Sequence, residues 1–323
     1  MAISLEDKKD SAALRWFFVS DHESFIQVYK EIFSGLPPKY LPILDSLCHN
    51  VSGLHLTAGL PFRMAGVAVE SRRFSLNLAA ERIRNRRPEF SALSDAEKES
   101  RAEEIARKNF AQYASSEAGS ESLACELLSS LERFLENPDV AHAARELLRQ
   151  ATVLAWSTIE ALANDVFIAT LNEFPSLAVD LQRDERTRKR FQIRDMTDAL
   201  VEFNYTLKGH MGDVLNRSQK LDDVETMRAV FDVIFPNSSR LRTELLDASL
   251  WRLYQRRNLI LHRRAIVDVA YLNNTGEKLQ LGSELTVDTA AFDKDLAILV
   301  HVSFSLLDAF KKSVCRTASD TEN

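Results

Sequence analysis

The sequence has few turn-forming residues and few cysteines. Its 323 residues include nine Gly, eight Pro and three Cys. So few Gly and Pro leave little material for the tight turns of an all-β sandwich or barrel, and we expect a mainly helical fold. Cys48, Cys125 and Cys315 show no metal-binding spacing and cannot all pair within one chain. They favour a reducing, cytoplasmic compartment.

Long apolar runs and a general basic excess are also missing. The most apolar window, around residues 296–307, is interrupted by polar side chains, and acidic residues stand where an export signal needs an apolar core. The net charge of −6 argues against a generally basic nucleic-acid-binding surface, although it leaves room for a local basic site. We therefore expect a cytoplasmic protein with no membrane partner.

Polar and turn-rich stretches suggest how the chain is divided. The small, polar segment 115–122 is typical of a linker. We therefore expect a helical region of unknown role over residues 1–118, a helical domain over 119–317, and a frayed tail over 318–323. Residues 51–66 are rich in Gly, and their pattern predicts no particular fold.

Helix signals are clearest where capping residues precede an apolar stripe. Ser94 and Glu97 form a predicted capping box, and Asn-Pro-Asp at 137–139 predicts the start of a helix that continues to about Phe174. A further helix is expected over roughly 240–264. Residues 265–290 show two-residue alternation and predict a small strand pair or an extended loop before the last helix.

Most motifs that mark an enzyme are absent. The sequence has no Gly-rich phosphate loop, no GxGxxG, no HExxH and no GxSxG elbow, and its seven histidines are scattered singly. We therefore expect neither a cofactor nor a metal centre.

One basic segment stands out in this acidic chain. Seven Arg residues fall between Arg240 and Arg264, against Glu244 and Asp247. On a straight helix, Arg257 falls on the core-facing apolar stripe, where its charge needs a partner or the rim of a cleft. That predicted stripe consists of Leu246, Leu250, Leu253 and Ile260. Asn258 and His262 are four residues apart and share another face of the same helix.

This segment resembles a known family. Arg257-Asn258-x3-His262, late in an amphipathic helix, is similar to the Arg-x4–6-His motif of HEPN-domain ribonucleases, in which a polar residue such as Asn commonly follows the Arg. The helix that contains Ala155–Leu162 is similar to the family's leading helix. The stretch 263–285 resembles the segment before the last helix in one prokaryotic branch. The likeness covers about residues 120–315 and implies a HEPN-like helical bundle.

The resemblance implies a metal-independent RNA endonuclease, commonly a homodimer whose two motif helices line one cleft. An imidazole, with an ordinary pKa of about 6.5, suits His262 to move the proton of a ribose 2′-OH. Arg257 would stabilise the charge on the phosphate through two parallel hydrogen bonds, and Asn258 would orient the imidazole or the phosphate. Many relatives act as toxins or antiviral effectors, so a regulatory partner such as an antitoxin is implied as well.

Several residues around the motif have open roles. Arg256 also fits the spacing, as Arg-x5-His, so the sequence does not decide between Arg256 and Arg257. Glu160 is either a partner that orients Arg257 or His262, or a solvent-facing carboxylate. Three further cations are candidates for binding RNA phosphates. They are Arg252, Arg263 and Arg264.

The spacing of the two motif residues leaves their arrangement open. Residues five apart on a straight helix point about 140° from each other. Arg257 and His262 therefore converge only if the helix bends, if the Arg reaches round it, or if a second subunit contributes.

Two interpretations other than a ribonuclease also stay open. One is a non-catalytic HEPN-like module that dimerises or binds nucleotides. The other is an ordinary helical bundle with a solvated Arg cluster.

Overall fold

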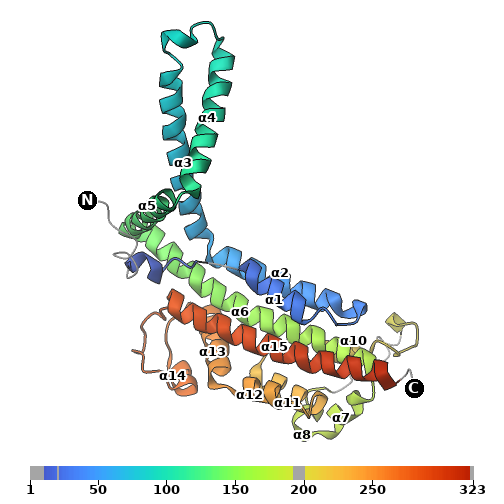
Figure 1. Ribbon diagram of the computed structural model, residues 1–323. Coiled ribbons are helices and arrows are strands. Elements are labelled where there is room, and N and C mark those ends of the chain that lie inside the picture. The colour runs from blue at the N-terminus through green and yellow to red at the C-terminus, as the bar shows by residue number, and fades with distance from the viewer. Residues whose placement is uncertain (1–10, 20–21, 192–200, 321–323) are drawn as a thin grey trace. The chain divides into compact units, whose positions relative to one another are not determined.

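The computed structural model describes residues 11–19, 22–191 and 201–320, and the fold is all-α, as the sequence predicts (Figure 1). Within these ranges, the only β-type pairing is an isolated antiparallel bridge between Ile266 and Glu284.

The chain forms two compact units, each built from two stretches of sequence. One unit combines residues 1–20 with 58–147, and the other combines 21–57 with 148–323. The boundary predicted between residues 118 and 119 falls inside the first of these units. The predicted division into residues 1–118 and 119–317 stays a prediction.

In the first unit, two long antiparallel helices, α3 and α4, form a hairpin (Figure 1). The core of this unit is built from Ala, Leu and Phe side chains, among them Phe17, Ala65 and Leu131. The elements of this unit are η2 Ala12–Arg15, α3 Leu60–Arg84, η4 Pro88–Phe90, α4 Asp95–Ser115, α5 Glu117–Glu136 and the first turns of α6 Pro138–Glu173.

The predicted capping box is present, and the predicted linker is wrong. The Ser94 side chain accepts from the Glu97 amide, while the Glu97 carboxylate accepts from the Ser94 backbone. Helix α4 ends at Ser115 and α5 begins at Glu117, so the segment 115–122 is helical apart from Ser116. Gly119 serves close packing there, because a Cβ at this position would lie 1.8 Å from the Tyr113 carbonyl oxygen.

In the second unit, the long helices α6 and α15 lie side by side (Figure 1). A buried hydrogen bond joins them, from Thr152 Oγ1 to Asp295 Oδ2 at 3.0 Å. The fully buried Trp156 and Phe310 are among the largest core side chains of these two helices. The other elements are α1 His22–Ile32, η3 Pro38–Tyr40, α2 Leu41–Ala58, α7 Leu177–Arg183, α8 Glu185–Arg188, α10 Met211–Ser218, α11 Val224–Ile234, α12 Ser239–Leu246, α13 Ala248–Arg263, α14 Val269–Thr275 and α15 Thr289–Asp320.

Several boundaries differ from the prediction. The helix expected over 240–264 is two helices, because the Asp247 side chain caps α13, and Leu246 before it is 61% exposed rather than in the core. The stretch 265–290 contains helix α14 and a single bridge rather than a strand pair. Helix α15 continues to Asp320, since no Gly or Pro ends it earlier, so the predicted tail at 318 is helical as far as the description extends.

The turn-rich segment 51–66 is almost entirely helical. Gly53 and Gly66 lie inside α2 and α3, and only Gly59 separates these helices. Pro61 occupies the start of α3, where its missing N–H costs no hydrogen bond.

Candidate functional site

Helix α13 positions the motif, and both of its ends are fixed. The Asp247 side chain accepts a hydrogen bond from the Ser249 amide at the N-terminus. At the C-terminus, Arg264 and Ala265 have φ values of 52° and 62°, and both amides donate to the Leu259 carbonyl. Two successive positive φ angles are uncommon without Gly. They end the helix directly after the motif and turn the chain towards α14.

Arg256 is held in a buried network of carboxylates. Its Nη1 donates to Asp295 Oδ1 at 3.2 Å, and its Nη2 donates to Glu277 Oε1 at 3.0 Å. The Tyr271 hydroxyl donates to the other Glu277 oxygen at 2.7 Å. Burial raises the pKa of Asp295 to about 6, although the neighbouring Arg256 favours its charged form. Arg256 therefore links α13 to α15 and to Glu277, shortly after the end of α14.

Arg257 makes fewer hydrogen bonds to other protein groups than Arg256 does. Its Nη1 donates to Asn258 Oδ1 at 2.9 Å, and its Nη2 lies 3.9 Å from Glu160 Oε2, beyond hydrogen-bond distance. Its Nε is buried without a partner. A guanidinium has five N–H donors, so most of those on Arg257 are unused. Burial raises the pKa of Glu160, and the attraction of Arg257 opposes this shift.

His262 and Asn258 line a shallow pocket of about 160 Å³, which we call the His262 pocket. Its lining is Gln255, Asn258, Leu259, His262, Arg263, Asp268, Ala270 and Tyr271. Arg257 is not among these residues. The structure therefore brings Asn258 together with both Arg257 and His262, but it does not bring Arg257 and His262 together within one chain.

Sequence reasoning missed Gln255 as a site residue. Gln255 precedes Asn258 by three positions and His262 by seven, so helical spacing places all three on one face of α13. This helical spacing could have identified Gln255 as a site residue from the sequence. The contribution of Asp268 and Ala270 depends on how the chain turns after α13, which no local pattern indicates.

The three predicted phosphate-binding cations have different surroundings. Arg252 donates from Nη2 to Ser249 Oγ at 3.0 Å and is half-buried. Arg263 lines the His262 pocket, with its Nε 3.4 Å from Asp268 Oδ2 in a partly exposed ion pair. Arg264 is exposed at the left-handed C-cap of α13. An RNA-binding role for each of them stays a prediction.

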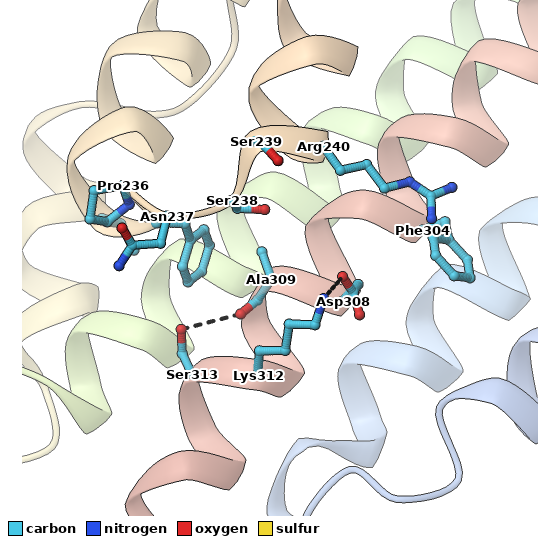
Figure 2. A pocket seen from close by; sticks show the side chains of 12 residues that line it. Pro236, Asn237, Ser238, Ser239, Arg240, Phe304, Asp308, Ala309, Lys312 and Ser313 are labelled. Atoms are coloured by element: carbon cyan, nitrogen blue, oxygen red, sulfur yellow. Dashed lines mark hydrogen bonds and ion pairs between the residues drawn. The ribbon is translucent and has the colours of Figure 1, made fainter.

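Two larger pockets lie away from the motif. One, of about 470 Å³, lies between the start of α12 and α15 (Figure 2). Its cations are engaged within the protein, because Arg240 stacks 4.4 Å above the Phe304 ring and Lys312 pairs with Asp308 at 2.7 Å. The other, of about 480 Å³, is lined by Lys39 and Glu173, which pair with each other. Neither pocket contains a histidine or a cysteine.

In the described part of the chain, no three or more His, Cys, Asp or Glu side chains are grouped so as to hold a metal ion. None of the described helices combines the length and apolar character needed to cross a membrane. No family model matches the sequence, and neither a curated protein nor a solved structure shows a significant match to it.

Proposed function

We propose that the chain is a metal-independent RNA endonuclease that uses Arg257 and His262. The observation that carries this proposal is the contrast between the two neighbouring arginines. Arg256 donates to the carboxylates of Asp295 and Glu277, whereas Arg257 donates to the neutral amide oxygen of Asn258 and its paired carboxylate, Glu160, lies 3.9 Å away. Of the two, Arg257 is therefore the better ligand for a phosphate.

The chemistry needs only groups that α13 carries. The His262 imidazole accepts the proton of the ribose 2′-OH, and the 2′-oxygen attacks phosphorus. As the new bond from the 2′-oxygen to phosphorus forms, the bond to the 5′-oxygen breaks, and the imidazolium returns its proton to that leaving oxygen. Arg257 stabilises the extra negative charge on the phosphate. The products are a 2′,3′-cyclic phosphate and a 5′-hydroxyl, so DNA, which lacks the 2′-OH, is not cleaved.

The proposal includes a homodimer. Because His262 lines a pocket that Arg257 does not reach, one chain presents the two groups on different sides of α13. A second copy that packs its own α13 against the first would place the Arg257 of one chain beside the His262 of the other. This arrangement follows from the helical spacing and from the resemblance to HEPN ribonucleases.

The proposed biological setting rests on the same resemblance. We place the enzyme in the cytoplasm, where it acts as a toxin or antiviral effector and is controlled by an antitoxin or another regulatory protein. Induced expression of the wild type should then arrest growth, whereas expression of the His262→Ala variant to the same level should not. Equal growth with both proteins would contradict this role.

The enzymatic proposal is tested by RNA cleavage in excess EDTA. Wild type, His262→Ala and Arg257→Ala are compared after each has been shown to elute identically in size exclusion. His301→Ala is a matched control, because His301 is exposed on α15 and lies outside the His262 pocket. We expect cleavage by wild type and the control only. Cleavage by all four proteins, or by none, would contradict the proposal.

A further inference from the structure

The His262 pocket contains a buried amide whose oxygen accepts a hydrogen bond from a neighbouring side chain. Gln255 is only 9% exposed and lines the pocket. Its Oε1 accepts a hydrogen bond from Asn274 Nδ2 at 3.3 Å. The main chain at Asn274 is held in place, because its backbone carbonyl oxygen accepts from Trp251 Nε1 at 2.8 Å. With its oxygen occupied, Gln255 has its NH₂ group left, and that group has no partner in the described part of the chain.

Asn258 has the same arrangement one helical turn later. Its Oδ1 accepts from Arg257 Nη1 at 2.9 Å, and a guanidinium can only donate, so the oxygen of Asn258 must face Arg257. The NH₂ group of Asn258 is then left as the second donor. The pocket thus offers two neighbouring amide NH₂ groups, while both amide oxygens accept hydrogen bonds from within the protein.

This pattern distinguishes between the purines. The N7 edge of guanine carries two adjacent acceptors, N7 and O6, whereas the same edge of adenine carries the N7 acceptor and an N6 amino donor. Two protein donors match guanine and leave the amino group of adenine facing another donor. The pocket volume of about 160 Å³ is below the roughly 300–1,000 Å³ of sites for whole drug-sized ligands, so it suits one ring system rather than a whole nucleotide.

We propose that the His262 pocket is a base-recognition site that selects an unstacked guanine through the amide nitrogens of Gln255 and Asn258. Leu259 and Ala270 supply the apolar walls. The inference rests on the proposed function, because it makes this guanine a neighbour of the phosphate that His262 acts on. Sequence-specific recognition of RNA generally uses such unstacked bases.

The test is nucleotide binding by the full-length protein, which requires no cleavage. The probes are the 5′-monophosphates of guanosine, inosine, adenosine and 7-deazaguanosine, titrated separately by calorimetry or ligand-observed NMR. Inosine keeps both acceptors and should bind like guanosine. Adenosine and 7-deazaguanosine each lack one acceptor and should bind about tenfold more weakly. Equal binding of all four, or binding of none, would overturn the inference.

Two variants locate the selectivity. Gln255→Met should abolish the preference for guanosine, whereas Gln27→Met, the same change on the exposed face of α1, should not affect it. Asn274→Asp replaces the donor by an acceptor, so the Gln255 amide should turn and present its oxygen to the pocket. The resulting acceptor–donor pair matches adenine, and the preference should shift towards adenosine. Unchanged selectivity in Asn274→Asp would contradict the assigned orientation.

The outcomes separate this inference from the proposed function. Selective guanosine binding by a protein that does not cleave RNA would support the pocket and refute the nuclease. RNA cleavage that depends on His262 but shows no purine selectivity in binding would support the nuclease and refute the pocket.

Discussion

Arg257 Nη1 donates a 2.9 Å hydrogen bond to Oδ1 of Asn258, the next residue on α13. This contact joins two sides of the helix. Arg257 faces Glu160 on α6, and Asn258 lines the His262 pocket. Asn258 is therefore the structural link between the cation and the imidazole that the proposed chemistry needs.

Changing Asn258 to Asp should impair cleavage more than changing it to Ala. A carboxylate beside Arg257 would form an ion pair with it and reduce the positive charge available to a phosphate. Loss of one such charge-stabilising contact typically lowers kcat about 10²–10³-fold. The measurement is single-turnover cleavage by both variants at saturating RNA. Faster cleavage by Asn258→Asp than by Asn258→Ala would contradict this account of Arg257.

Substitution of Arg256 should mainly lower stability, whereas substitution of Arg257 should mainly lower activity. Arg256→Met leaves the 1%-exposed Asp295 without its cation, which we expect to cost about 3–5 kcal/mol in the free energy of unfolding. Arg257→Met removes a single hydrogen bond between protein groups and should cost about 1 kcal/mol. Urea denaturation measures both values.

A double variant serves as the control for this comparison. Arg256→Met combined with Asp295→Asn removes both charges, so it should recover part of the stability that Arg256→Met loses. Arg257→Met should lose cleavage while it stays folded. Greater destabilisation by Arg257→Met than by Arg256→Met would show that the assigned functions are reversed.

Asp295 should make the stability depend on pH. Its pKa in the folded protein is raised to about 6, above the roughly 3.9 of an unfolded Asp. The folded protein therefore binds this proton more tightly, and the associated stabilisation is present below about pH 4 and is lost as the pH rises through about 6. The free energy of unfolding of wild type relative to Asp295→Asn should fall over this interval. A constant difference from pH 4 to 7 would contradict the raised pKa.

A homodimeric site should allow two inactive variants to complement each other. A mixed dimer of Arg257→Ala and His262→Ala would contain one composite site with both groups intact. Mixing equal amounts of the two proteins under conditions of subunit exchange should therefore restore about a quarter of wild-type cleavage, because about half of the dimers are mixed and each of these has one intact site of two. If each chain uses its own Arg257 and His262, the mixture stays inactive.

Much of the fold could be predicted because its signals are local. Asn137-Pro-Asp gave the start of α6 and Pro175 its end, and the capping box at Ser94 gave the start of α4. The linker prediction was wrong because composition does not distinguish a flexible Gly from one used for close packing. At Gly119, the Tyr113 carbonyl oxygen comes so close across the turn between α4 and α5 that no Cβ fits.

The site was predicted only in part. Helical spacing places Asn258 and His262 on one face, and the structure puts both in one pocket. The carboxylate partners of Arg256 come from residues 21 and 39 positions later in the chain, so no local pattern could reveal that this arginine is paired within the protein. The hydrogen bond to the Gln255 amide likewise comes from Asn274, which lies 19 residues away.

The most direct test of the nuclease is cleavage of an RNA in EDTA beside a matched substrate that carries a 2′-deoxyribose at the cleavage site. The account predicts that wild type cleaves only the all-ribose substrate, leaves 2′,3′-cyclic phosphate and 5′-hydroxyl ends, and loses this activity in His262→Ala. Cleavage of the 2′-deoxy position, 5′-phosphate ends, or equal activity in His262→Ala would contradict the central claim.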